Sequence, residues 1–390
     1  MQRQLSTLLF TCSIGVVSLF GCALSAQAET TPPPAVPLQA LQDFVSVYER
    51  VRTEHVEPHN DEELLTLALQ GLMLKLDPYS AFLDADATRA LEESTSGSYV
   101  GIGIEIEPAG HHILVITPVD GSPALRAGIQ TGDWITHING KHVKGLDNTA
   151  IGQLITGPAG SKVSLNVLRQ GKEFTLTMQR EHINMPSVRA ELMKDRIGYL
   201  RISQFQERTA LELIEQMQDL KEQGAKAWLL DLRNNPGGLI HSGAAVADAF
   251  LQKGIIVTTR GRQEAGNMIY EADPLDPSQD MPTIVLINRG SASAAEIVAA
   301  ALQENKRAHL AGQQSFGKGS VQSVISLDEE RSIKLTTAYY YTPKGRNLNN
   351  NGIVPDYKLK LNARQKDEFD NIEKSEVILQ QAISLLQKRL

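Results

Sequence analysis

The chain has 390 residues, of which 42% are hydrophobic and 21% are charged, and its formal net charge is −7. A chain of this length is expected to form two or three domains, each able to bury its own core. It shows neither a basic block nor a basic excess, so we do not expect a nucleic-acid-binding protein.

The N-terminal residues have the pattern of an export signal. After Arg3 no charged residue occurs until Glu29, and residues 8–20 are largely apolar. The sequence Ala-Gln-Ala at 26–28 provides the small residues that a signal peptidase requires. We therefore expect residues 1–28 to be a signal peptide and the mature protein to lie in the periplasm or cell envelope.

Two other interpretations of this leader remain open. The sequence LFGC at 19–22 also looks like a lipobox, in which the leader would end at Gly21 and Cys22 would carry a lipid anchor. Phe20 is bulky for its position in such a motif. The uncharged stretch is also long enough for an uncleaved membrane anchor.

The cysteines and histidines argue against metal and thiol chemistry. Both cysteines, Cys12 and Cys22, lie in the leader, so the mature chain has no disulfide and no thiol nucleophile. The nine histidines are scattered, only His111 and His112 are adjacent, and no HExxH motif occurs. We expect neither a zinc site nor any other metal or organic cofactor.

Residues 38–90 are expected to be helical. Beyond a short proline-rich linker at 30–34, apolar residues recur at mostly helical spacing. A second helix is expected at 64–76, with acidic residues opening its first turn and Pro78 preventing its continuation.

Residues 97–181 are expected to form a small β-rich module. Short runs of alternating apolar residues are separated by Gly and Asn-Gly turns, which is typical of antiparallel strands. One helix is expected within the module, at 149–155.

From residue 190 to residue 361 the pattern is that of an α/β core. Strand-like apolar runs alternate with helical stretches, which indicates buried parallel strands covered by helices. The segment 362–390 is expected to end in a helix. The strands expected in the core are 197–202, 227–232, 254–259 and 283–288, and the helices are 209–223, 242–251 and 294–305.

A serine in the segment RGSASAAE, residues 289–296, is a candidate nucleophile. It follows an apolar strand and precedes an alanine-rich helix, an arrangement that exposes a hydroxyl at a helix N-terminus. No G-x-S-x-G motif and no His–Asp pair accompanies it. Lys318 is a candidate base, because its flanking glycines allow close backbone approach. From spacing alone, Lys318 could also be a surface lysine in a flexible turn. A phosphate-binding loop is excluded, because it requires Ser or Thr after the lysine and Gly319 stands at that position.

Five segments together resemble the carboxyl-terminal processing (tail-specific) proteases, a family of Ser–Lys peptidases with a PDZ domain. They occur in the same order as in that family and extend over almost the whole mature chain. The segments are LDPYSAFL (76–83), GIGI (101–104), DLRNNPGG (231–238), GSASAAEI (290–297) and FGKGSVQ (316–322).

The resemblance implies a role for each of three residues. The family's nucleophile stands three residues before a glutamate, which is Ser293 here, and Ser291 would then be structural. The family's general base corresponds to Lys318, and the supporting glutamine corresponds to Gln322. Lysine has an ordinary pKa of about 10.4, and burial among apolar and small residues can lower it by several units.

The resemblance also implies an oxyanion hole built from backbone N–H groups. One would be that of Ala294, at the positive end of a helix dipole. The other would come from a glycine in the pair Gly237 and Gly238, and the sequence does not distinguish between them.

The module at 97–181 resembles a PDZ domain. The loop formed by Ile102, Gly103 and Ile104 corresponds to the one that receives a peptide's terminal carboxylate, and the strand 105–107 could pair with an extended peptide. Side chains of the expected helix would either line the peptide groove or belong to the module's own core. These residues are Ile151, Leu154 and Ile155.

The sequence therefore predicts an α/β multidomain protein with an α/β protease core of layered β-strands and helices, an inserted β-rich PDZ domain and helical terminal segments. We expect an exported serine endopeptidase that recognises substrate C-termini. Its expected partners are proteins or peptides with free C-termini. A homo-oligomer formed through the terminal helices and an adaptor protein are further possibilities that the family suggests.

Two alternatives fit the same modules. The chain could be a non-catalytic PDZ scaffold or adaptor in the cell envelope, although the intact Ser293, Lys318 and Gln322 argue against this. It could also be a trypsin-like protease with an attached PDZ domain, but the G-x-S-G segment that such an enzyme needs is missing.

Overall fold

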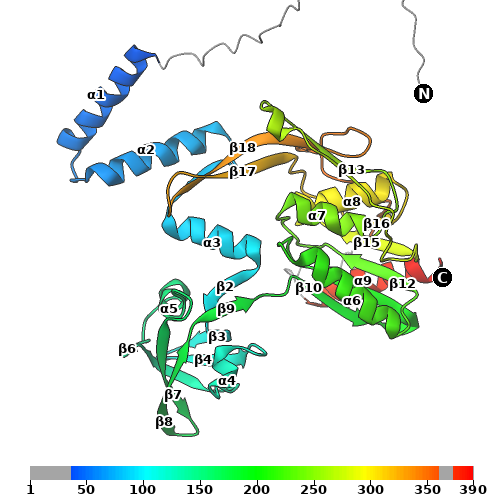
Figure 1. Ribbon diagram of the computed structural model, residues 1–390, viewed down its shortest axis with the longest axis horizontal. Coiled ribbons are helices and arrows are strands. Elements are labelled where there is room, and N and C mark those ends of the chain that lie inside the picture. The colour runs from blue at the N-terminus through cyan, green and yellow to red at the C-terminus, as the bar shows by residue number, and fades with distance from the viewer. Residues whose placement is uncertain (1–36, 360–371, 390) are drawn as a thin grey trace, which may run out of the picture. The chain divides into compact units, whose positions relative to one another are not determined.

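The computed structural model describes residues 37–359 and 372–389 (Figure 1). The predicted leader and the beginning of the predicted C-terminal segment lie outside the described residues. The chain divides into two compact units, Met1–Leu67 and Ala68–Leu390, which are described separately. In neither described stretch is there a helix both long and apolar enough to cross a bilayer.

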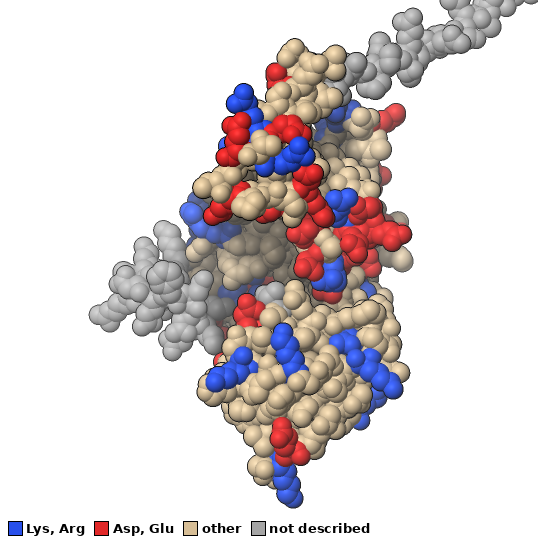
Figure 2. Space-filling model, turned by 90° about the vertical axis from the view of Figure 1, so that its left-hand side faces the viewer, with Lys and Arg blue, Asp and Glu red and all other residues tan. Residues whose placement is uncertain are grey.

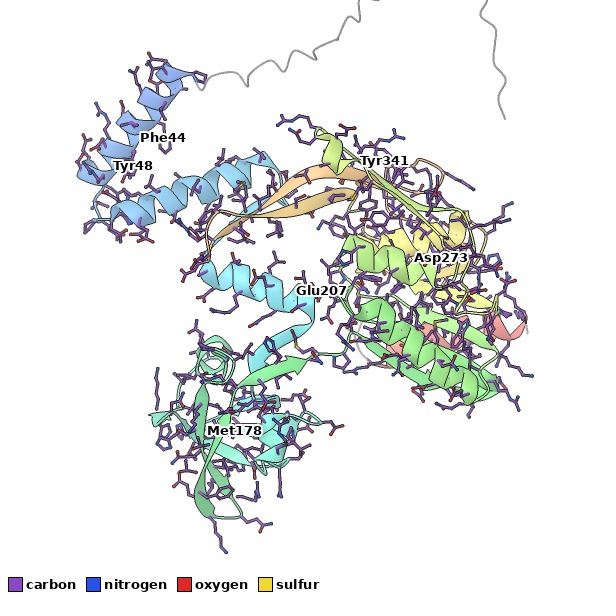
Figure 3. All side chains as sticks on the ribbon, in the orientation of Figure 1. Phe44, Tyr48, Met178, Glu207, Asp273 and Tyr341 are labelled. Carbon is purple, nitrogen blue, oxygen red and sulfur yellow. The ribbon has the colours of Figure 1, made fainter. Side chains whose placement is uncertain are left out.

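The first unit contains α1 (Leu38–Glu54) and the beginning of α2 (Asp61–Leu76). The acidic residues in the first turn of α2 lie where the helix dipole favours negative charge, as the sequence predicted. No residue of α1 is buried, and Figure 3 shows Phe44 and Tyr48 on this helix. The apolar spacing of α1 thus predicts its helical structure correctly, although none of the apolar side chains on this helix is buried among the described residues.

The second unit begins with the remainder of α2, a short strand β1 (Ala81–Leu83) and α3 (Ala85–Ser96). The side chain of Asp84 accepts a hydrogen bond from the Ala87 N–H and so caps α3. A two-stranded ribbon follows, in which β2 (Ser98–Gly101) pairs with β9 (Glu181–Asn184). β2 leads from α3 into the β-rich module, and β9 leads from the module to the α/β core.

The β-rich module contains one antiparallel sheet in the order β3-β4-β5-β7-β8, with β6 paired to β5. Its apolar core includes Ile102, Val115 and Leu165, together with Met178 of β8, which Figure 3 labels. The predicted helix is present, and a four-residue helix that the sequence analysis missed accompanies it. The elements are β3 (Ile104–Ala109), β4 (His112–Pro118), α4 (Pro123–Arg126), β5 (Trp134–Ile138), β6 (Lys141–His142), α5 (Asn148–Ile155), β7 (Lys162–Arg169) and β8 (Lys172–Gln179).

The α/β core is built on a six-stranded sheet in the order β10-β11-β12-β15-β16-β19. All of its neighbouring pairs are parallel except β10–β11. Every residue of β12 and β15 is buried, which explains their continuous apolar sequences. The strands are β10 (Val188–Leu192), β11 (Ile197–Ile202), β12 (Ala227–Asp231), β15 (Thr283–Ile287), β16 (His309–Gly312) and β19 (Tyr357–Lys358).

Helices cover both faces of this sheet. Alternate strand residues such as Leu230 and Val285 pack with α6 (Thr209–Glu222), α7 (Ile240–Asp248) and α8 (Ala294–Glu304). The intervening residues, such as Leu229 and Ile284, pack with α9 (Ile372–Gln387). The predicted layering of helices on buried parallel strands is therefore confirmed.

The strand expected at 254–259 was predicted to belong to the parallel sheet of the α/β core, but it lies in a different sheet. It forms β13 (Ile255–Gly261) of a five-stranded sheet, paired antiparallel with β14 (Ile269–Glu271) and β18 (Ser332–Tyr341). Unlike β12 and β15, this strand is only partly buried and ends in polar residues, so its surroundings differ from those of a central parallel strand. The other strands of the sheet are β1 and β17 (Ser320–Ser326).

Charged side chains on the face drawn in Figure 2 form no continuous basic patch. Lys and Arg are scattered there, whereas Asp and Glu gather more closely at mid-height.

Candidate active site

Ser293 lies at the junction between β15 and α8. Its backbone has φ 54° and ψ −118°, a region that residues with a side chain rarely adopt. Such a conformation costs about 1–3 kcal/mol and persists only where surrounding contacts enforce it. The residue is 8% exposed and occupies the N-cap position of α8, so the sequence folds as the expected strand, turn and helix.

Ser291, the rival nucleophile, holds the turn together. Its side chain is fully buried, and its hydroxyl donates to the Leu232 carbonyl at 2.7 Å. The same oxygen accepts the Asn288 N–H at 3.0 Å. The Ser291 hydroxyl therefore acts as both donor and acceptor within the protein, as expected of a serine with a structural role.

The buried carboxylate of Glu296 joins the serine turn to the lysine loop. One oxygen, Oε2, accepts the backbone N–H groups of Ser293 and Lys318, each at 2.9 Å. The other, Oε1, accepts the Ser315 hydroxyl at 2.5 Å and the Gly317 N–H at 2.8 Å. Two segments that are remote in sequence are therefore held by one side chain.

Burial raises the pKa of Glu296, and these hydrogen bonds oppose the shift. The hydroxyl of Tyr340 adds a longer contact to Oε2 at 3.4 Å. In the sequence, Glu296 served only to identify the serine three residues before it. Its role in joining the two segments was indicated by one feature, a glutamate in the otherwise apolar first turns of an alanine-rich helix, because a buried charge needs several hydrogen-bond partners.

Lys318 lies in the loop before β17 and is partly buried. Burial lowers the pKa of its amine below the ordinary value of 10.5, Lys334 lowers it further, and Glu296 opposes both effects. The amine nitrogen lies 5.0 Å from the centre of the Tyr79 ring. Within the described residues this amine makes no hydrogen bond with the Ser293 hydroxyl, although Glu296 binds the backbone of both residues.

Gln322 lies on β17 and belongs to a separate hydrogen-bond network. Its amide donates to the Ser320 hydroxyl at 2.9 Å and to the Thr336 hydroxyl at 3.4 Å. Thr336 is its cross-strand neighbour on β18 and donates in turn to Asp77 at 3.1 Å. Gln322 is thus connected to the LDPYS segment.

Gly237 packs directly against Ser293. Its φ is 104°, and a Cβ there would lie 2.6 Å from Ser293 Cβ and 3.0 Å from the Ala294 nitrogen. No side chain can occupy this place. Its N–H, however, donates to the Asn235 side chain at 2.9 Å. The N–H groups of Gly238 and Ala294 have no hydrogen-bond partner in the part of the chain that the structure describes.

The predicted peptide-binding loop lies in the β-rich module. Ile102 is fully buried, so only its backbone could meet a ligand, and Ile104 is partly buried. Gly103 has φ 70°, and a Cβ there would lie 2.4 Å from Ser122 Cβ. The strand that follows, β3, is an edge strand of its sheet.

The helix α5 contributes mainly to the core of the module. Ile151 and Ile155 are buried within it, and Leu154 packs against it while partly exposed. Of the two interpretations that the sequence left open, the core therefore applies to Ile151 and Ile155, and Leu154 alone retains exposed surface.

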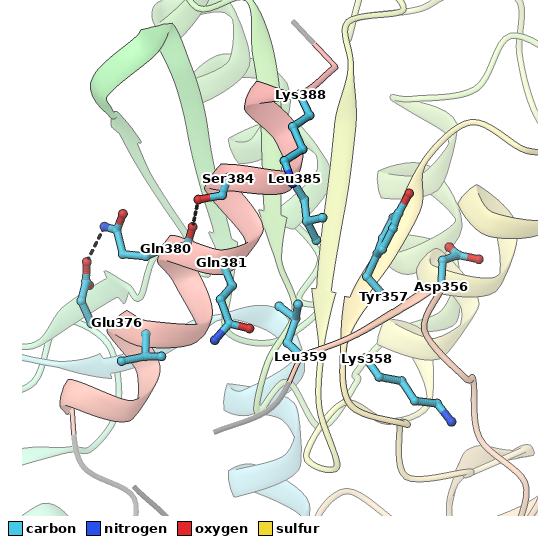
Figure 4. Close-up of a pocket in the computed structure, with 11 residues that line it drawn as sticks. Asp356, Tyr357, Lys358, Leu359, Glu376, Gln380, Gln381, Ser384, Leu385 and Lys388 are labelled. Atoms are coloured by element: carbon cyan, nitrogen blue, oxygen red, sulfur yellow. Dashed lines mark hydrogen bonds between the residues drawn. The ribbon is translucent and has the colours of Figure 1, made fainter. Parts of the chain in front are cut away.

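A cavity of about 950 Å³ lies elsewhere, between β19 and α9 (Figure 4). It is lined by apolar side chains such as Leu359 and Leu385 and by the polar side chains of α9. Ser293, Lys318 and Gln322 do not line it.

Comparison with known proteins identifies two regions. Residues 196–359 match the model of peptidase family S41, and residues 100–179 match that of the PDZ domain. The carboxy-terminal-processing protease of Bartonella bacilliformis is 42% identical over 349 residues, which are 88% of this chain and 80% of that protein. The carboxy-terminal processing protease CtpA of Bacillus subtilis is 36% identical over 316 residues, 80% of this chain and 68% of that protein.

A solved structure, that of the photosystem II D1 C-terminal processing protease, is 30% identical with a TM-score of 0.48. The match covers 83% of this chain and 94% of that one.

Proposed function

Since this chain belongs to peptidase family S41, the family of the carboxy-terminal processing proteases, we propose that it is a serine endopeptidase with a Ser293–Lys318 dyad. The observation that carries the proposal is the Glu296 carboxylate, which binds the backbone of both residues. A nucleophile and a base that act together need such a common support.

The proposed reaction proceeds through an acyl-enzyme. The neutral Lys318 amine accepts the hydroxyl proton as Ser293 Oγ attacks the substrate carbonyl carbon. The ammonium then gives this proton to the leaving amine as the C–N bond breaks. Water then attacks the resulting ester while the same amine accepts its proton, and the ammonium returns that proton to Ser293 Oγ as the bond from the acyl carbon to this oxygen breaks. The lowered pKa of Lys318 supports this role, because a protonated amine cannot accept a proton.

The developing oxyanion requires hydrogen-bond donors that are not already used. Ala294 N–H meets this requirement at the N-terminus of α8. Of the two glycines, Gly238 has an N–H without a hydrogen-bond partner among the described residues, whereas the Gly237 N–H donates to Asn235 and Gly237 packs closely against the serine. We therefore assign the second donor to Gly238 and a packing role to Gly237.

The PDZ domain is proposed to bind the C-terminus of the substrate. The free edge of β3 supports this assignment, because an extended peptide can add to an edge strand. In the proposed domain division, 97–181 carries this function and 190–361 carries the chemistry. Residues 38–90 and 362–390 supply the helical segments through which an oligomer could form, and an adaptor is a further proposed partner.

Export is proposed on the basis of the N-terminal sequence. A mature N-terminus at Glu29, measured by intact mass, would support a free periplasmic enzyme. A lipidated Cys22 would support an envelope anchor, and the retention of residues 1–28 without lipid would contradict both.

The dyad is tested by replacing Ser293 or Lys318 with Ala. Each variant should lose peptide cleavage by at least roughly 10³-fold while keeping its circular dichroism spectrum, because the two residues act as a unit. Lys318→Arg should also be inactive, since a guanidinium does not deprotonate in proteins.

Ser291→Ala is the matched control. It should remain active in its folded fraction, although it removes a buried hydrogen bond. Cleavage that persists in Ser293→Ala but disappears in Ser291→Ala would reverse the assignment. A folded Lys318→Ala variant with full activity would instead favour the alternative that Lys318 is a surface lysine without a catalytic role.

A further inference from the structure

The LDPYS segment forms a rigid turn directly after α2. The Asp77 carboxylate accepts the N–H groups of Tyr79 and Ser80, both at 2.8 Å, and the Ser80 hydroxyl at 2.7 Å. Bonds from one side chain to the backbone two and three residues later fix such a turn. Although burial raises it, these hydrogen bonds hold the pKa of Asp77 below its ordinary value, so the carboxylate stays charged.

This turn is fastened to the strands that lead away from Lys318. The Thr336 hydroxyl donates to Asp77 at 3.1 Å, and the Thr336 N–H donates to the Ser80 hydroxyl at 3.1 Å. Immediately afterwards β1 pairs with β18, where Ala81 lies opposite Lys334. Tyr79 is therefore held in place relative to β18.

The ring of Tyr79 faces the amine of Lys318 at 5.0 Å from its centre, within the distance of a cation–π contact. The other ionisable groups that act on this amine are Lys334, which lowers its pKa, and Glu296, which raises it. The Tyr340 hydroxyl donates to the Lys318 carbonyl and so acts on the backbone of the loop. An aromatic ring attracts the ammonium and not the neutral amine, so its effect opposes that of burial.

We propose that Tyr79 is a positioning residue for the catalytic base, holding the protonated Lys318 amine on its ring until the amine loses its proton. The proton passes to solvent, the attraction to the ring disappears, and the neutral amine can then reach the Ser293 hydroxyl. The absence of a Ser293–Lys318 hydrogen bond in the described residues agrees with this waiting position. The proposal rests on the dyad proposed above.

The test compares Tyr79→Leu with Tyr79→Phe in the full-length protein. Leucine keeps an apolar neighbour but removes the ring, so the ammonium loses its partner. The acid limb of kcat/KM should then move to lower pH by about 0.4 to 1.5 units, whereas phenylalanine should keep the original midpoint. Tyr341→Leu is a matched control, because Tyr341 makes a cation–π contact of 4.8 Å with Arg260 and none with Lys318.

A second measurement does not depend on activity. In the Ser293→Ala background, the rate at which acetic anhydride modifies Lys318 is followed against pH by mass spectrometry. Tyr79→Leu should shift this titration in the same direction as the acid limb. If Leu, Phe and Tyr at position 79 give one midpoint while Lys318→Ala is inactive, the inference about Tyr79 is wrong and the dyad stands. If Lys318→Ala remains fully active, the dyad itself fails.

Discussion

At the scale of single residues, Glu296 is the side chain whose removal should affect the site most without touching the substrate. It accepts hydrogen bonds from both segments that carry the proposed dyad. Hydrogen bonds to a charged group contribute about 1.5–3 kcal/mol each, and a donor left without a partner costs a similar amount.

Glu296→Gln tests this role. Glutamine has the same shape but replaces one acceptor oxygen with an NH₂ group, which would face N–H or O–H donors whichever way it turned. We expect kcat to fall roughly 10- to 150-fold, which corresponds to the loss of one such bond, with a smaller change in KM. Ser315→Ala, which removes a single bond to the same carboxylate, is the control and should lose less. Equal kcat in Glu296→Gln and the unmodified protein would refute the assignment.

Ser293 and Lys318 could be named as candidates from the sequence, because each stands in a short motif with neighbours that are close in sequence. The roles proposed for Glu296 and Tyr79 could not, because they depend on contacts between segments that are far apart. Tyr79 is 239 positions from Lys318 along the chain (318 − 79), and the two meet only because Thr336 and β1 fasten the turn to β18. Local sequence patterns carry no information about such pairings.

At the scale of elements, periodicity predicted the core helices α6, α7 and α8 and three of the six strands of the core sheet, β11, β12 and β15. The short strands β10, β16 and β19 were not predicted, and β13, which looks like the other apolar runs, pairs antiparallel in a second sheet. Sheet membership is decided by long-range pairing, and an apolar run alone does not define its neighbours. In the same way, the four-residue α4 was too short to show a period.

The loop before β3 supplies the prediction at this scale. If the backbone N–H groups of Ile102, Gly103 and Ile104 receive the terminal carboxylate, amidating the substrate C-terminus removes its charge and one acceptor oxygen. Loss of a charge-assisted hydrogen bond should reduce affinity roughly 10- to 150-fold. Below saturation, equal cleavage of amidated and free-carboxylate peptides would contradict this binding mode.

At the scale of the whole molecule, the PDZ domain lies in sequence between the N-terminal helices and the α/β core. The ribbon of β2 and β9 joins both of its ends to the rest of the chain. Residues next to this ribbon make hydrogen bonds to the core, such as that from the Gln204 amide to Ser94 at 2.7 Å. These bonds join α3, which leads into the ribbon, to the core segment that precedes the glycine segment.

Deletion of residues 97–181 should consequently reduce cleavage of even a short peptide that does not reach the PDZ domain. The measurement is kcat/KM for that peptide, alongside a thermal unfolding scan to show that the core remains folded. A folded deletion variant that cleaves the short peptide as fast as the full chain would limit the PDZ domain to tethering.

The free edge of β3 has a consequence for how molecules of this protein meet one another. An open strand edge accepts any extended chain, including the same edge of a second copy, and would then lead to aggregation. Glu105 and Glu107 are exposed on this strand, and Pro108 has no N–H to offer. Two such edges brought together would place like charges side by side. The acidic residues therefore guard against self-pairing while leaving the edge open to a partner of different sequence.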